Sequence, residues 1–125
     1  MDALNTFLTE LKKSCGNLNL KNIICLIAEP PELVPINFGK DIFDEGTLAQ
    51  LLCTVSAGDE PLTITWSFHG NNISSDSGIM TSKLGTKTQF LMIQSVSHGH
   101  RGMYTCMAKN NAGTATSVAE LKVNG

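Results

Sequence analysis

Apolar and polar residues alternate along most of the chain from residue 29 onward, which is the pattern of strands with one buried face. The segment 47–55 is the clearest case, because Ala49, Leu51, Cys53 and Val55 would all point to one side. Glycine, asparagine and proline residues separate the short alternating runs from one another. The pattern therefore predicts an all-β domain of short strands joined by turns.

The first strand is expected to differ from the others. Prolines at 30, 31 and 35 confine it to a sheet edge and divide it into two halves, because proline cannot donate a ladder hydrogen bond. A tight turn is expected at 70–72, where glycine precedes two asparagines. The remaining strands are predicted at 62–69, 79–84, around Leu91 and Ile93, at 102–110 and at 114–123.

Two cysteines, one tryptophan and one tyrosine indicate how these strands pack. Cys53 and Cys106 are 53 positions apart, Trp66 lies between them, and Tyr104 stands two residues before the second cysteine. An immunoglobulin-type sandwich requires a cross-link between its sheets, an indole packed on it, and a tyrosine whose hydroxyl binds the backbone. The four residues therefore predict two antiparallel sheets joined by a Cys53–Cys106 disulfide. Two further positions complete the predicted core signature: Leu91 and Gly102.

The domain is predicted to occupy residues 29–125, and its short C′ region favours the intermediate set (I-set) over an antibody variable domain. Residues 1–28 have a different character and no evident place in the sandwich. Their short apolar run, 23–28, falls below the usual hydrophobic region of a signal peptide. The segment is either a poor signal-like sequence or a mispredicted or alternatively spliced start. Cys15 and Cys25 are expected to be unpaired, or removed with this segment.

The net charge and the cysteines limit the partners and the cellular location that the chain can have. A net charge of −2 gives no basic surface for nucleic acid, and no apolar run is long enough for direct membrane insertion. A disulfide persists in an oxidising compartment, so we expect an extracellular or cell-surface location, with any plasma-membrane anchor outside this sequence. Cytosolic muscle-type domains, which use the same fold with reduced cysteines, are the alternative. The sequon Asn72-Ile73-Ser74 agrees with export and is expected on an exposed turn.

Catalytic and metal-binding patterns are weak. His98 and His100 lie two residues apart, but a metal site there lacks clear third and fourth ligands, and His69 is distant in sequence. No nucleophile, base and acid stand together, and no glycine-rich phosphate loop occurs. We therefore expect no enzymatic activity, no cofactor and no metal.

One face of the predicted sandwich is unusual. Because Cys53 faces the core, Leu52, Gln50 and Leu48 on the same strand point away from it. In the strand around Leu91 and Ile93, those two residues face inward, so Phe90 and Met92 would point outward. Both strands belong to the same sheet in this fold, so their outward residues would lie together. Clustered apolar residues on a solvent face usually mark a protein contact. The alternatives are that scattered apolar residues are ordinary, or that the N-terminal segment covers them.

From residue 30 to residue 125 the chain resembles immunoglobulin domains of the Down syndrome cell adhesion molecule (Dscam) family of arthropods. The likeness is carried by PPELVPINFG, GDEPLTITW, HRGMYTC and NNAGTATSVAELKVNG, and is strongest for the variable seventh domain and the N-terminal domain of shortened chelicerate Dscams. His100 stands where most immunoglobulin domains have an aspartate that pairs with arginine, and that Dscam domain shares the departure. We therefore expect no such ion pair here.

The resemblance implies homophilic cell adhesion and neuronal self-recognition, in which an identical domain on an opposing molecule binds antiparallel through strands A, B, E and D. Rival interpretations are a receptor or soluble immune module that binds a different cell-surface protein, and a structural spacer. By position, the homophilic contact would comprise Gln50, Leu52, Thr54, Thr88, Phe90 and Met92, with Met80 and Ser82 added where the phase of strand D allows.

Overall fold

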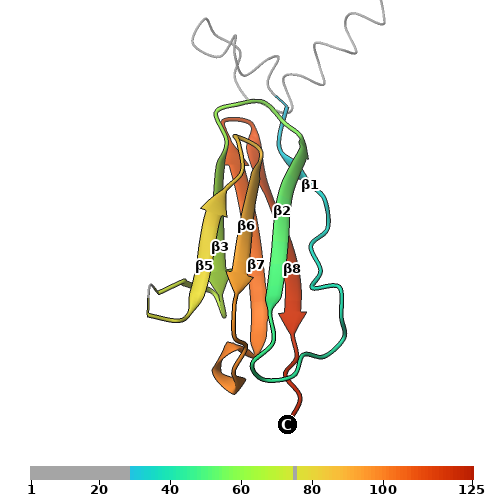
Figure 1. Cartoon of the computed structure of the whole chain (residues 1–125). Coiled ribbons are helices and arrows are strands. Elements are labelled where there is room, and N and C mark those ends of the chain that lie inside the picture. Colours follow the sequence, from blue (N-terminus) through green and yellow to red (C-terminus); the bar gives the residue numbers. More distant parts are fainter. Residues whose placement is uncertain (1–28, 75) are drawn as a thin grey trace, which may run out of the picture.

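The computed structural model describes residues 29–74 and 76–125, which form two antiparallel sheets of four strands each (Figure 1). The segment 1–28, with Cys15 and Cys25, lies outside the described residues. The first sheet contains, in order, β1 (Glu32–Leu33), β2 (Ala49–Ala57), β6 (Thr88–Ile93) and β5 (Ile79–Lys83). The second contains β4 (Asn71–Asn72), β3 (Thr63–Phe68), β7 (Gly102–Asn110) and β8 (Gly113–Leu121).

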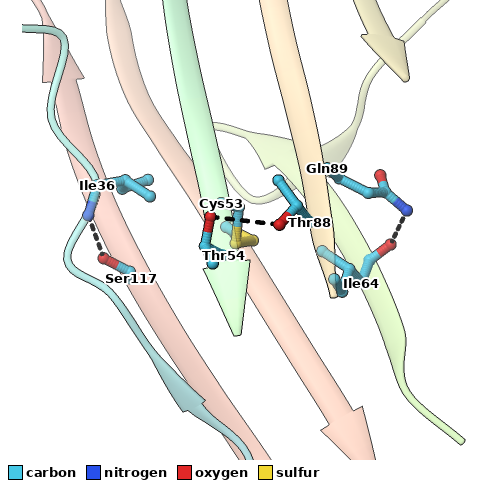
Figure 2. The surroundings of a disulfide bond; sticks show 8 residues. Ile36, Cys53, Thr54, Ile64, Thr88, Gln89 and Ser117 are labelled. Atoms are coloured by element: carbon cyan, nitrogen blue, oxygen red, sulfur yellow. Dashed lines mark hydrogen bonds between the residues drawn. A yellow bond between two sulfur atoms is a disulfide. The ribbon is translucent and has the colours of Figure 1, made fainter. Parts of the chain in front are cut away.

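This arrangement confirms the predicted I-set sandwich, in which β1, β2, β5 and β6 are strands A, B, D and E. The inward residues Ala49, Leu51, Cys53 and Val55 of β2 are almost fully buried, as the alternation predicted, and Leu91 and Ile93 of β6 have no exposed surface. The Cys53–Cys106 disulfide joins the two sheets, and both cysteines are buried (Figure 2). Trp66 lies directly opposite Cys106 in the β3–β7 ladder and belongs to the same core.

The first strand divides as its prolines predicted. Its initial part is β1, whose Leu33 pairs with Val55 of β2. The chain then crosses to the other sheet, where the Ile36 N–H donates to the Ser117 hydroxyl at 3.1 Å (Figure 2). Farther on, Phe43 forms a parallel bridge with Val123. One edge segment therefore contacts both sheets in turn and closes one side of the sandwich.

Some element boundaries differ from those expected. The turn after β3 consists of His69 and Gly70, both with positive φ (52° and 80°), rather than 70–72. This tighter turn returns the chain early enough for Asn71 and Asn72 to pair with β3 as β4. At the other end of the sheet, β8 begins at Gly113, which pairs with Asn110 and extends the β7–β8 hairpin to its tip.

The tyrosine of the signature holds the entry to β7. The Tyr104 hydroxyl is buried and donates to the His100 carbonyl at 2.6 Å. Burial also raises the pKa of this hydroxyl far above its ordinary value, so it keeps the proton that it donates. Gly102 lies between the two residues with a φ of 142°, and an added Cβ would meet the His69 imidazole. A side chain at 102 is therefore disfavoured by its backbone conformation as well as by this contact.

We expect Tyr104→Phe to lower the free energy of unfolding by about 1–2 kcal/mol, because it leaves the buried His100 carbonyl without its hydroxyl donor while preserving the aromatic packing. Urea denaturation followed by Trp66 fluorescence measures the change. A variant as stable as the parent would show that water replaces the hydroxyl without cost.

Candidate protein contact face

The outward side chains of β2, β6 and β5 lie in cross-strand rows on the solvent side of the first sheet. Leu52 is opposite Phe90, which in turn is opposite Ser82. The next row contains Gln50, Met92 and Met80. Each row therefore brings one residue from every strand within side-chain contact distance.

A third row closes this surface toward the end of β2. Thr54 lies opposite Thr88, and their hydroxyls are 3.4 Å apart (Figure 2). All eight residues expected at the homophilic contact are thus on one face of one sheet. The phase of β5, which the sequence left open, follows from Ile79: its side chain is buried, so Met80 and Ser82 point outward.

The apolar members of the face differ in exposure. Leu52 and Met80, on the flanking strands, expose 54% and 53% of their surface. Phe90 and Met92 are only half-buried on the central strand β6, since strands on both sides shield them. The side chains most available to a partner are therefore Leu52 and Met80, whereas Phe90 and Met92 form the floor between them.

Further exposed apolar residues extend this surface. Leu48 precedes β2 in phase with Leu52, and Leu84 follows β5 in phase with Met80; they expose 50% and 55% of their surface. The Leu84 N–H donates to the Thr88 carbonyl, which places it beside the threonine row. We call the following ten residues the contact face, and none of them is charged: Leu48, Gln50, Leu52, Thr54, Met80, Ser82, Leu84, Thr88, Phe90 and Met92.

Leu84 was missed by the sequence reasoning, although its spacing from Met80 offered a signal. Because Ile79 is buried, residues 80, 82 and 84 all point to the outer side of the sheet. Knowing the orientation of β5 would therefore have identified Leu84. What the sequence left undetermined was whether Ile79 or Met80 faces the core, because both are apolar. The structure resolves that choice through the pairing of Ile79 with Ile93.

The three histidines have separate partners. His98 contacts Glu45 at 3.2 Å, and the His69 ring lies 3.2 Å from the Arg101 carbonyl. His100 is buried: its Nδ1 accepts the Ser97 N–H at 3.0 Å, and its Nε2 lies 2.7 Å from the Ser77 carbonyl. Among residues 29–74 and 76–125, no three histidine, cysteine or acidic side chains gather as metal ligands would.

Comparisons with known proteins, by sequence and by structure, agree with this fold. Residues 38–123 match the family model of the immunoglobulin I-set domain. The chain is 41% identical to a crystal structure of the Dscam1 Ig7 domain, isoform 5, with a TM-score of 0.73, covering 76% of this chain and 97% of that one. This chain belongs to the Dscam family of I-set immunoglobulin domains.

Curated members of the Dscam family are cell adhesion molecules by name. Over 96 residues the chain is 42% identical to the Drosophila melanogaster cell adhesion molecule Dscam1, and over 94 residues it is 39% identical to human DSCAML1. These matches cover 76% and 75% of this chain, but only 5% and 4% of the relatives. An I-band fragment of titin, I67–I69, shares the fold at 27% identity and a TM-score of 0.67, covering 76% of this chain and 32% of that one.

His100 occupies a distinctive position in this Dscam-family domain. His100 replaces the expected aspartate, and its ring binds Ser77 and Ser97 rather than the neighbouring arginine. The loop before β5 is thereby tied to the loop before β7. Within the described part of the chain, no helix is long and apolar enough to cross a membrane.

Proposed function

We propose that this domain mediates cell-surface recognition by binding a second copy of itself through the contact face. The observation that carries the proposal is the exposure of Leu52 and Met80 within a contact face whose ten members are all uncharged. Alternation in a two-sheet sandwich would place polar residues at such positions. Burial against a partner removes this apolar surface from water and so favours association.

A second copy fits this face for reasons of symmetry. Two identical faces related by a two-fold axis form an isologous contact, in which each residue meets its own mate or a matched partner. A charge near that axis would meet its own copy and oppose pairing. An uncharged face avoids this repulsion, and the exposed Leu52 and Met80 of one copy can lie over the half-buried Phe90 and Met92 of the other. The names of the Dscam relatives, all cell adhesion molecules, support the same assignment.

The affinity of one domain for another is expected to be modest. A contact limited to one face of a small domain lies at the low end of specific interfaces, and we expect a dissociation constant on the order of micromolar. Adhesion between cells would then depend on many copies acting together.

Leu52→Lys tests the proposal most directly, because the side chain is exposed and its replacement leaves the core unchanged. Sedimentation velocity of the full chain should show a concentration-dependent dimer for the parent. The lysine variant, and likewise Phe90→Lys, should weaken dimerisation by at least about tenfold, equal to 1.4 kcal/mol. Beads coated with the parent should aggregate with parent beads and not with Leu52→Lys beads.

Val118→Lys is the matched control, since Val118 has a similar exposure, 48%, but lies on the opposite sheet. It should dimerise like the parent, with an unchanged circular dichroism spectrum. A parent that stays monomeric at high concentration, or a Leu52→Lys variant that dimerises normally, would refute the homophilic contact.

A further inference from the structure

The outer face of the second sheet also carries exposed apolar side chains. Met103, Met107 and Val118 expose 43%, 38% and 48% of their surface. Thr105 lies opposite Val118 in the β7–β8 ladder, and the two methionines flank Thr105 along β7. We call these three apolar residues the methionine patch. The domain thus has exposed apolar groups on both of its broad faces, and a contact through one face leaves the other to be explained.

The glycosylation sequon opens onto this same face. Asn72-Ile73-Ser74 is the only Asn-X-Ser/Thr triplet in the sequence. Asn72 is exposed and lies opposite Ser67 in the β3–β4 ladder. Because the neighbouring Trp66 points into the core, Ser67 and its partner Asn72 point outward. A group attached to Asn72 therefore leaves the domain on the side of the methionine patch.

Asn72 and the methionine patch share one cross-strand row. Asn72 is opposite Ser67, Ser67 is opposite Thr105, and Thr105 is opposite Val118. The ends of the row are three strand spacings apart, roughly 14 Å. The two residues between them, Ser67 and Thr105, are small and hydroxylated, so they provide hydrogen-bonding groups without standing above the sheet.

We propose that Asn72 carries an N-linked glycan whose first sugars lie along this row and cover the methionine patch. The Ser67 and Thr105 hydroxyls would bond to sugar hydroxyls, and the methionine and valine side chains would contact the apolar faces of the sugar rings. The glycan covers one broad face and leaves the other free for protein. Only this last consequence rests on the proposed homophilic function.

The modification itself needs a donor that the secretory pathway supplies, a lipid-diphosphate-linked oligosaccharide. The amide nitrogen of Asn72 bonds to the anomeric carbon of the first sugar as the bond from that carbon to the diphosphate oxygen breaks. The lipid diphosphate leaves with the electron pair, and the amide nitrogen releases one proton. No oxidation or reduction takes place. The inter-sheet disulfide requires an oxidising compartment of the same pathway, so both modifications are available to one molecule.

Attachment is tested by intact mass after secretion of the full chain from cultured animal cells behind a heterologous signal peptide. One glycan should be present and should be removed by peptide-N-glycosidase. Asn72→Gln and Ser74→Ala should abolish it, whereas Asn71→Gln and Ser74→Thr should retain it, since Asn71 lies outside the sequon and threonine preserves it. A parent secreted without a glycan would overturn the proposal.

Coverage is tested by methionine oxidation, because exposed thioethers react with dilute peroxide and buried ones do not. With the protein dilute, Met103 and Met107 should oxidise severalfold faster in Asn72→Gln than in the glycosylated parent. Met80, which exposes 53% of its surface on the opposite sheet, should oxidise at the same rate in both and is the internal control. Equal rates for Met103 and Met107 in the two proteins would show that the sugars extend away from the patch.

The same measurement separates this inference from the homophilic contact. Raising the protein concentration should protect Met80 if copies pair through the contact face, whatever the state of Asn72. Glycan-dependent protection of Met103 and Met107 without concentration-dependent protection of Met80 would uphold the glycan cover and refute the dimer. The reverse result would refute the glycan cover alone.

Discussion

Replacing both bridging cysteines, Cys53→Ala with Cys106→Ala, is expected to lower the free energy of unfolding by about 4 kcal/mol. The disulfide spans 53 positions of sequence, so its loss frees a long loop in the unfolded chain. Both sulfur atoms are also buried between the sheets, and alanine leaves part of their volume empty. A domain of this size commonly has a total stability of about 5–15 kcal/mol, so the loss would be a large fraction of it.

Urea denaturation of the full chain, monitored by fluorescence of Trp66 beside Cys106, measures this change. The matched control is Cys15→Ala with Cys25→Ala, which replaces the other two cysteines of the chain and keeps the Cys53–Cys106 bridge, so the loss due to that bridge should be absent. Treatment of the parent with a strong reductant should reproduce the effect of the first pair of substitutions. Equal stability of the parent and the bridge-free variant would show that packing alone holds the two sheets together.

Asn110→Ala is expected to lower the free energy of unfolding by about 2–4 kcal/mol, because one buried amide makes four hydrogen bonds. Its nitrogen donates to the carbonyls of Glu29 and Asp59, at 2.6 and 3.0 Å. Its oxygen accepts the N–H groups of Ala112 and Gly113, at 2.8 and 3.0 Å. Removing the amide leaves two donors and two acceptors at this end of the domain without their partner.

Asn111→Ala provides the control, since it changes the same residue type one position along, where the side chain is exposed. The midpoint of its urea denaturation should equal that of the parent. Asn110→Asp separates the two halves of the network: its carboxylate still accepts from Ala112 and Gly113 but cannot donate to Glu29 and Asp59. An Asn110→Ala variant with unchanged stability would mean that water satisfies all four groups.

Alternation within strands and the spacing of four signature residues were enough to predict the sandwich. In β2, alternation set the phase because Cys53 marks the inner side; in β6, where residues 90–93 are all apolar, the phase came from placing Leu91 and Ile93 inward. The spacing of Cys53, Trp66, Cys106 and Tyr104 then fixed how the sheets face each other. The outward positions of Leu52, Phe90 and Met92 followed from these phases without any further information.

Contacts between distant loops could not be predicted in this way. Nothing around Asn110 in the sequence indicates that its amide nitrogen reaches Glu29, which is 81 positions away. The partners of His100 could not be predicted either. The sequence showed a histidine in place of the usual aspartate, but not that the ring would contact Ser77 and Ser97. These contacts depend on loop conformations that only the assembled sandwich determines.

The two ends of the described domain lie at opposite poles, with Glu29 held beside the β7–β8 hairpin and Asn124 beyond the far end of β8 (Figure 1). Near the second pole, Phe43 accepts the Asn124 N–H at 2.7 Å and donates to the Lys122 carbonyl at 2.9 Å. A pulling force between the poles runs along the strands, whereas ladder hydrogen bonds lie across them. Tension would therefore load many of these bonds together in shear instead of opening them singly, and the domain could bear mechanical strain while its broad faces stay intact.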